Sequence, residues 1–194
     1  MHEAYSGFFA FGERAAWLRA HREYITEIMR LATSACRDMA TDPMPLLLFT
    51  LDGSRYALQL SAVERVLPLV EIAPLPGAPA IVSGVIDCHG HLLPVINMRR
   101  RFGLAERPAM LSDQLVVAHT IRRTVALLVD TTLNVITIQS REMVDASEIL
   151  SGLGQLDGVL KMDNGLVVIH NLTSVLSLDE EGRLDAAMGA ASAD

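Results

Sequence analysis

At Gly84–Leu104 the chain reads GVIDCHGHLLPVINMRRRFGL, and this stretch decides the fold. Two apolar runs, Val82–Cys88 and Leu92–Met98, flank the tripeptide His89-Gly90-His91. Glycine permits the positive φ that a tight reversal needs, so the pattern predicts a β-hairpin. Asn97 can offer a side-chain oxygen to free backbone N–H groups, which predicts a brief helical piece at 97–102.

Working outward, short apolar runs separated by turn residues continue in both directions. Asp52-Gly53-Ser54 and Asp163-Asn164-Gly165 are turn sequences, and Ser61 and Asn171 are further candidate helix N-caps. The pattern indicates about ten short strands joined mostly by hairpins, which favours antiparallel sandwiches or small barrels. The strands fall into two similar sets, so the fold class is mainly β with two small barrels. Besides the central hairpin, the runs are 46–51, 56–60, 66–72, 115–121, 125–129, 133–138, 159–162 and 166–170.

Two flanking segments differ from this β-rich region of residues 46–177. Residues 1–42 form an N-terminal extension, in which 12–40 carry apolar residues at three- and four-residue steps and predict an amphipathic α-helix. Residues 178–194 carry five acids and one base, and like charge favours extension over packing. We therefore expect residues 178–194 to be an acidic flexible tail.

Composition excludes several classes of protein. A hydrophobic share of 51% excludes a disordered chain, and a net charge of -7 argues against nucleic acid as a partner. No apolar stretch reaches the ~18–20 residues needed to cross a bilayer, and no signal peptide is recognisable. The two distant cysteines, Cys36 and Cys88, do not form a secreted disulfide framework. These features predict a cytoplasmic protein without membrane insertion.

The densest polar cluster is Asp87-Cys88-His89-Gly90-His91, whose side chains are of types that ligate transition metals. The alternative interpretation is an exposed hairpin turn, which we favour because Cys88 and His89 would point to opposite faces of an extended strand. The triplet Arg99-Arg100-Arg101 could bind phosphate or nucleic acid, but the acidic composition favours a solvated helix face. No phosphate-binding glycine loop or nucleophile elbow is present.

The central block resembles that of the CheW-type chemotaxis coupling proteins, which usually reads G-V-I-N-L-R-G-x-V-V-P-V-I-D-L-R-x-R-F-G. Three further stretches are similar to the family in the same order, so the resemblance covers about residues 46–177. They are 49–58 for the first hairpin, 128–136 for the family's V-D-x-V-x-x-V-L with looser spacing, and 158–176 for the closing strands and helix.

The resemblance implies two five-stranded antiparallel β-barrels with a shared apolar seam and no catalysis, cofactor or metal. It implies a non-enzymatic adaptor that couples a CheA-type histidine kinase to the cytoplasmic tip of a chemoreceptor. The alternative function is a metal-dependent or thiol enzyme built on residues 87–91. The N-terminal helix departs from the family pattern, and it could pack on the barrels, on a partner helix or on a second copy.

Two departures fall where the family carries opposite charges. His89 replaces the arginine of N-L-R-G, and Asp87 replaces its asparagine. Arg65 stands where the family's V-x-E-V has glutamate. A neutral imidazole cannot reproduce the bidentate contacts of arginine, so we predict an altered receptor interface. The candidate partner-binding residues are Val63, Arg65, Val66, Val82, Asp87, His89, Arg99 and Arg101, although any one of the valines could be ordinary core.

Overall fold

The protein is described by a computed structural model for residues 43–139, 142–145, 156–162 and 165–191. The described residues form eleven strands, two short 3₁₀ helices (η1 and η3) and two α-helices. In chain order the elements are β1 (Pro43–Leu51), β2 (Ser54–Gln59), η1 (Leu60–Ala62), β3 (Val63–Pro68), β4 (Val82–Cys88), β5 (His91–Asn97), α2 (Met98–Arg101), β6 (Gln114–His119), β7 (Thr124–Val129), β8 (Thr131–Gln139), β9 (Met143–Asp145), β10 (Leu156–Met162), β11 (Gly165–His170), η3 (Leu172–Ser174) and α4 (Leu178–Ala191).

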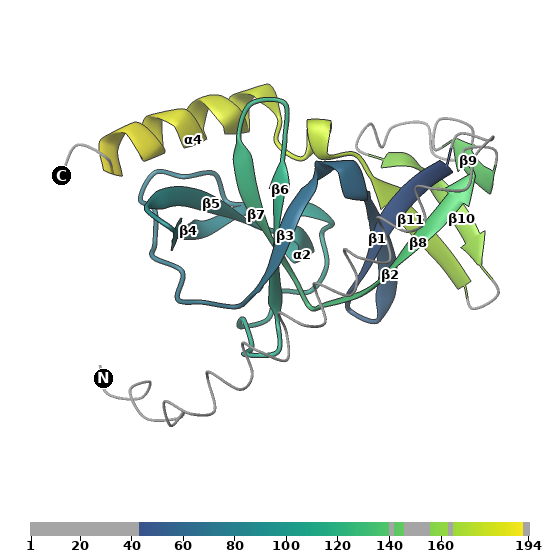
Figure 1. The fold of residues 1–194 in the computed structure, drawn as a ribbon. Coiled ribbons are helices and arrows are strands. Elements are labelled where there is room, and N and C mark those ends of the chain that lie inside the picture. The colour runs from purple at the N-terminus through teal and green to yellow at the C-terminus, as the bar shows by residue number, and fades with distance from the viewer. Residues whose placement is uncertain (1–42, 140–141, 146–155, 163–164, 192–194) are drawn as a thin grey trace.

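The strands form two sheets that lie side by side (Figure 1). One is six-stranded in the order β8-β1-β2-β11-β10-β9, and the other is five-stranded in the order β3-β6-β7-β5-β4. The chain enters the first sheet, builds the second, and returns to the first through β8. The predicted mainly β fold with two similar strand sets is therefore confirmed.

The prediction of two antiparallel five-stranded barrels is wrong in two respects. Each sheet contains one parallel pair, β2 with β11 and β5 with β7. Neither sheet is closed, because within the described residues the end strands of each sheet do not pair with one another. Hairpin patterns identify neighbours along the chain, whereas both parallel pairs join strands that are distant in sequence or separated by another strand.

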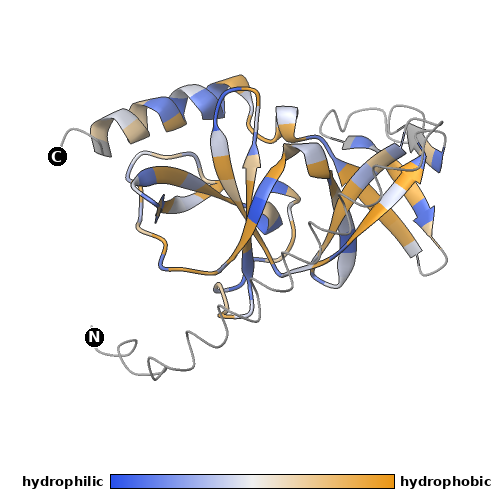
Figure 2. Cartoon of the chain, viewed as in Figure 1, coloured by the Kyte–Doolittle hydropathy of each residue, from blue (hydrophilic) through white to orange (hydrophobic). Residues whose placement is uncertain are grey.

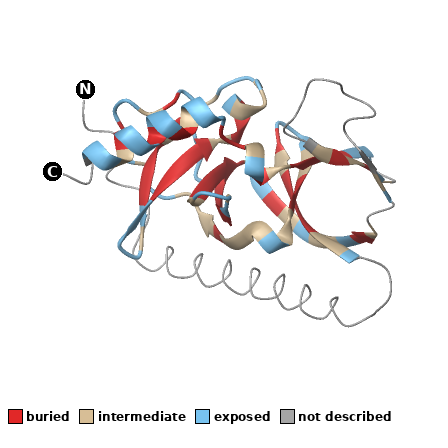
Figure 3. Ribbon diagram, turned by 90° about the horizontal axis from the view of Figure 1, so that it is seen from above, coloured by how far each residue is buried: buried red, intermediate tan, exposed pale blue. Residues whose placement is uncertain are grey.

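Strand β1 is buried on both faces, which explains its unbroken apolar run. Leu46 and Leu48 point into a cluster enclosed by the first sheet, and Leu47 and Phe49 point into a larger cluster shared with the second sheet. Successive side chains of a strand alternate between faces, so one strand serves both clusters. Figure 3 shows buried residues in the strands of both sheets.

The second sheet divides its residues in the same way. Leu115 and Val117 of β6 lie in a cluster on its inner face, whereas Val116 and Ala118 join the shared cluster. This shared cluster is the apolar seam that the resemblance implied, and it joins the two sheets into one body. The strands of both sheets are largely hydrophobic, as Figure 2 shows, while several connections are hydrophilic.

The connection between β3 and β4 pairs with the edge strand β4 at one point, where it forms an isolated antiparallel bridge. Ala73 and Val85 exchange two backbone hydrogen bonds, with N–O distances of 2.9 and 2.8 Å. Gly84, next to this bridge, has a φ of 148°, and a Cβ at its position would meet the backbone of Ala73. This close approach is possible because residue 84 has no side chain.

The predicted helix caps are confirmed at two of three positions. The Asn97 side chain accepts hydrogen bonds from the N–H groups of Arg99 and Arg100, and Asn171 accepts one from Thr173 N–H. Ser61 is not a cap, because η1 already begins at Leu60 after Gln59. The strand predicted over 66–72 lies earlier, at Val63–Pro68.

The acidic segment that follows β11 and η3 is a helix over most of its length, so the prediction of a flexible tail is wrong for residues 178–191. Helix α4 begins with a capping box, in which Ser177 Oγ accepts from Glu180 N–H and Glu180 accepts from Ser177 N–H. Arg101 pairs with Glu180 at 3.4 Å. Arg123 lies 3.2 Å from Glu181, without hydrogen-bond alignment, and also pairs with Asp185.

Replacing Leu184 by alanine is expected to lower the free energy of unfolding by about 2 kcal/mol, because the Leu184 side chain is fully buried where α4 meets the shared cluster. Urea denaturation followed by circular dichroism measures this loss. Leu178→Ala on the same helix is the matched control, since Leu178 is 79% exposed. Equal stabilities of the two variants would contradict the docking of α4.

Two predictions concern residues outside the described part of the chain. The amphipathic helix predicted at 12–40 lies there, as does most of the turn at 163–165. Within the described residues, no helix has both the length and the apolar character that crossing a membrane requires.

Candidate partner-binding site

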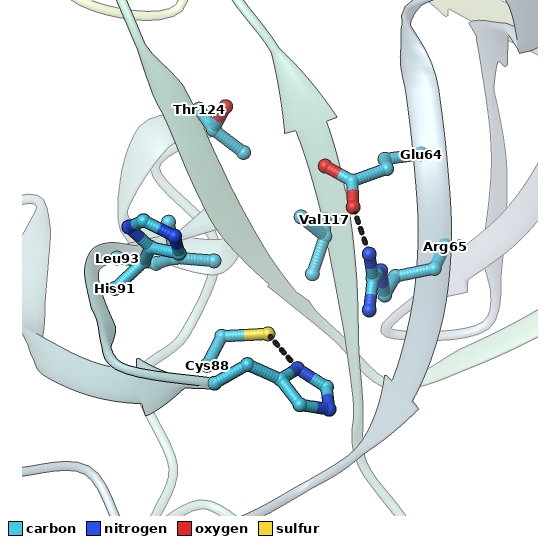
Figure 4. Close-up of a pocket in the computed structure, with 8 residues that line it drawn as sticks. Glu64, Arg65, Cys88, His91, Leu93, Val117 and Thr124 are labelled. Atoms are coloured by element: carbon cyan, nitrogen blue, oxygen red, sulfur yellow. Dashed lines mark hydrogen bonds and ion pairs between the residues drawn. The ribbon is translucent and has the colours of Figure 1, made fainter.

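An open pocket of about 370 Å³ lies between β3 and the β4–β5 hairpin (Figure 4). Leu93 and Val117, both buried, form its apolar base, and Thr124 lies on its wall. Arg65 enters from one side, while Cys88 and His91 enter from the hairpin on the other. The full lining is Glu64, Arg65, Cys88, His89, His91, Leu93, Val117 and Thr124.

The hairpin tip is held in a defined shape by its own backbone. His89 and Gly90 both have positive φ, 56° and 84°, and Asp87 Oδ1 accepts a 2.7 Å hydrogen bond from Gly90 N–H. Because His89 belongs to the turn and not to an extended strand, its ring lies on the same side as the preceding thiol. Cys88 Sγ and His89 Nδ1 are 3.6 Å apart. The prediction that these two side chains point to opposite faces is therefore wrong.

Strand β3 contributes two consecutive charged residues to the same pocket. A register irregularity between Val63 and Arg65 explains this, because a bulge turns adjacent side chains toward one face. Glu64 Oε1 pairs with Arg65 Nη2, and Glu64 Oε2 lies 3.4 Å from Nε2 of His119. His119 Nδ1 in turn lies 2.9 Å from Thr124 Oγ1. The carboxylate thus has a contact on each of its oxygens.

The structure brings two of the predicted partner-binding residues together in this pocket, Arg65 and His89. Asp87 is exposed on the same hairpin. Val66 and Val82 are buried in the shared cluster, and Val63 packs against it. The interpretation of the three valines as core residues agrees with this packing, and their predicted contact with a partner stays a prediction.

Arg99 is a buried part of an ionic network, so its interpretation as a solvated residue is wrong. It is 8% exposed, and its Nη2 lies 2.6 Å from Asp130 Oδ2. Its Nη1 donates to Asp52 Oδ1 and to the carbonyl oxygen of Ala105, at 3.3 and 3.2 Å. Arg107 pairs with the same Asp130 at 2.8 Å.

Burial works against the ionised form of Asp130, yet its pKa is held below the usual value. Hydrogen bonds from Arg99 and from Asp52 N–H, together with the charges of Arg107 and Arg99, outweigh the desolvation. The network joins the β1–β2 turn, α2 and the bend between β7 and β8, so it fixes the two sheets relative to one another.

Arg101 is also held within the protein and is not solvated. Its guanidinium lies between Glu180 and the carbonyl oxygen of Ser174, at 3.4 and 3.1 Å, and its side chain is only 10% exposed. Arg100, the middle residue of the triplet, is the exposed one. Partner contacts by Arg99 and Arg101 stay predictions, while their internal roles are direct observations.

No group of three or more histidine, cysteine, aspartate or glutamate side chains in the described ranges is arranged to hold a metal ion. The pocket instead presents one guanidinium, imidazoles, a thiol and an apolar base to solvent. Such a surface can recognise another protein through charge, hydrogen bonds and apolar contact.

Comparison with known proteins agrees with the fold. The family model described as a CheW-like domain matches residues 45–180. The chain belongs to the CheW-like family. Relatives include a "Chemotaxis protein CheW" from Rhizobium meliloti (strain 1021), which is 26% identical over 150 residues, covering 76% of this chain and 97% of that protein.

A second CheW chemotaxis protein, from Thermotoga maritima, is 26% identical over 132 residues, covering 68% of this chain and 86% of that protein. Among solved structures, the scaffolding protein TtCheW from Thermoanaerobacter tengcongensis superposes with a TM-score of 0.66. It covers 71% of this chain and 95% of its own, at 23% identity, and therefore supports the fold alone.

As a CheW-like protein, this chain is a non-enzymatic adaptor of a chemotaxis-type signalling system. The alternative of a metal-dependent or thiol enzyme at residues 87–91 is not supported.

Sequence reasoning missed the contribution of Glu64 to the pocket, although it stands beside Arg65 in the altered V-E-R-V segment. It also missed Thr124 and Val117, for which one sequence offers no sign.

Proposed function

We propose that this adaptor couples a CheA-type histidine kinase to a chemoreceptor tip, and that the pocket between β3 and the β4–β5 hairpin belongs to its receptor interface. The observation that carries the proposal is that Arg65 and His89, the two charge-altering departures from the family motif, line the same pocket. Residues that change together and meet on one open surface are candidates for setting partner choice.

The rigidity of the surroundings supports this role. The pocket base is built from buried residues of β5 and β6, and the hairpin is fixed by the Asp87–Gly90 hydrogen bond. An adaptor whose binding surface is already ordered loses little conformational entropy when it binds. It can therefore transmit a small displacement of a receptor to a kinase.

The charges of the pocket support an altered receptor partner. The guanidinium of Arg65 stands where the family motif has a carboxylate, and the cation expected at position 89 is replaced by an imidazole. A receptor whose surface complements the usual arrangement would meet a like charge at Arg65 and lose a bidentate contact at His89.

We also propose that residues 1–42 and 178–194 act as flanking elements to the adaptor domain, with 12–40 offering an apolar stripe to a partner helix, a second copy or the sheets.

The double variant Arg65→Glu/His89→Arg is expected to bind the receptor tip of an ordinary family member about tenfold more tightly than the native chain. Restoring the family's charge pattern removes one repulsion and adds one bidentate contact. Pull-down with a purified receptor tip, followed by titration, measures the change. Arg122→Glu, on the exposed β6–β7 turn, is the control for removing a positive charge elsewhere.

The coupling itself is tested by co-purification with a CheA-type kinase and a kinase assay with and without receptor. Receptor-dependent kinase activity that requires this chain supports the proposal. If the native chain bound a standard receptor tip as tightly as an ordinary family member does, the altered interface would be refuted. The adaptor role would still stand.

A further inference from the structure

The pocket gathers nitrogen-bearing side chains from three separate elements of the second sheet. Arg65 comes from β3, while His89 and His91 come from the β4–β5 hairpin. His119 of β6 is not part of the lining, but it contacts Glu64 and Thr124, which are. The Arg65 side chain is 42% exposed, and both hairpin histidines are exposed. A ligand that enters the pocket therefore meets hydrogen-bond donors on opposite sides.

Among the described residues, Glu64 is the only carboxylate that lines the pocket, and it is already engaged. Glu64 uses one oxygen on Arg65 and the other on His119. Asp87 stands outside the lining, and its Oδ1 accepts from the backbone of the turn. With Glu64 at -1, Arg65 at +1 and neutral imidazoles, the formal charge of the lining is zero. Any protonated histidine then makes the pocket positive.

We propose that this pocket receives an acidic side chain of the receptor-type partner, and that protonation of His89 strengthens the contact. The inference rests on the proposed function and deepens it by naming the chemistry of the partner. Arginine and protonated histidine are donors only, so a carboxylate is the side chain that satisfies both. The methylene groups of a glutamate or aspartate would lie against Leu93 and Val117 at the base.

His89 is better placed than His119 to act as the proton-dependent group. It sits at the exposed tip of the turn, outside the sheet, and its Nδ1 lies 3.6 Å from Cys88 Sγ. His119 is occupied by Glu64 and Thr124, and its protonation would strengthen the existing contact with Glu64. Imidazole side chains as a class change charge between pH 5 and 8, where carboxylates and guanidinium groups do not.

The test measures binding of the full chain to the cytoplasmic fragment of a chemoreceptor from the same organism, at pH 6.0 and 8.0. We expect the native chain to bind about fivefold more tightly at pH 6.0, since one added charge pair at a partly exposed site contributes about 1 kcal/mol. His89→Gln should bind equally at both pH values, and His89→Arg should bind tightly at both. Arg122→Gln, outside the pocket, should keep the native ratio.

A second readout separates a charge contact from a merely structural role of His89. By reciprocal linkage, an acid bound beside His89 favours the protonated ring, which the His89 ring C–H signals report in NMR spectra of the free and the bound chain. Binding with no pH dependence, or a pH ratio that survives in His89→Gln, would overturn this inference and leave the adaptor function standing. Absence of any receptor binding, with kinase binding retained, would overturn both this inference and the proposed receptor coupling.

Discussion

Replacing Gly84 by alanine is expected to lower the free energy of unfolding by about 4 kcal/mol or more, enough to unfold many domains of this size. A Cβ at this position would lie 2.1 Å from the carbonyl oxygen of Ala73 and 2.8 Å from Cγ2 of Ile72. The oxygen belongs to backbone held by the Ala73–Val85 hydrogen bonds, so it cannot turn away as a flexible side chain could. The φ of 148° adds backbone strain for any residue other than glycine.

Urea denaturation of Gly84→Ala and of Gly77→Ala gives the loss in the free energy of unfolding for each variant. The difference between the two losses measures the cost of the steric clash at Gly84. Gly77 also has a positive φ, 80°, but a Cβ there would meet nothing within 4 Å. Gly77→Ala should therefore cost only about 1–2 kcal/mol of backbone strain. If the two variants were equally stable, the approach of the Ala73 backbone to Gly84 would not be as close as described.

The central hairpin illustrates what sequence alone can predict. Local features placed β4 at Val82–Cys88, put the turn at His89-Gly90-His91 and identified Asn97 as a helix cap, and the structure differs in that β5 already begins at His91. Each depends on residues a few positions apart, where backbone chemistry decides the outcome. The parallel pairing of β2 with β11 could not be predicted in this way, because Arg55 and Val167 are brought together only by the whole fold.

Charges were the least predictable feature, because their partners are distant in sequence. Arg99 was assigned to a solvated face, yet Asp52 and Asp130 lie 47 and 31 residues away and remove it from solvent. The acidic segment after residue 177 was judged by its own repulsion, whereas Arg101 and Arg123 neutralise it from the second sheet. A local sign was available and was missed, namely the capping box Ser177-Leu178-Asp179-Glu180.

The candidate site was predicted in part. Arg65 and His89 were found because they break a family pattern, and no structure was needed to select them. Their meeting in one pocket depends on a bulge in β3 and on a positive φ at residue 89. Residue type alone decides neither feature, although histidine adopts a positive φ more often than most residues other than glycine.

Asp130→Asn is expected to lower the free energy of unfolding at pH 7 by about 3 kcal/mol, because it removes the charge shared by Arg99 and Arg107 while keeping the shape of the side chain. The buried Arg99 would keep its hydrogen bond to the carbonyl oxygen of Ala105, and its carboxylate contact would be reduced to Asp52, which is exposed and lies 3.3 Å away. The matched control is Glu106→Gln, which removes an ion pair of Arg100. Glu106 is 64% exposed, so its loss should be about 0.5 kcal/mol.

The dependence of this difference on pH identifies its origin. The pKa of Asp130 is lower in the folded protein than in the unfolded chain. The stabilisation that the Asp130 carboxylate contributes is therefore complete at pH values above the unfolded pKa of about 4, and it is lost as pH falls through the folded pKa. The free energies of unfolding of the native chain and of Asp130→Asn are measured with urea from pH 7 to pH 3. Their difference at each pH cancels the contribution of the other carboxylates, which both proteins share. The two stabilities should converge at low pH, where protonated aspartate and asparagine are both neutral. A difference that stayed constant would mean that Asp130 acts through its hydrogen-bonding shape and not through its charge.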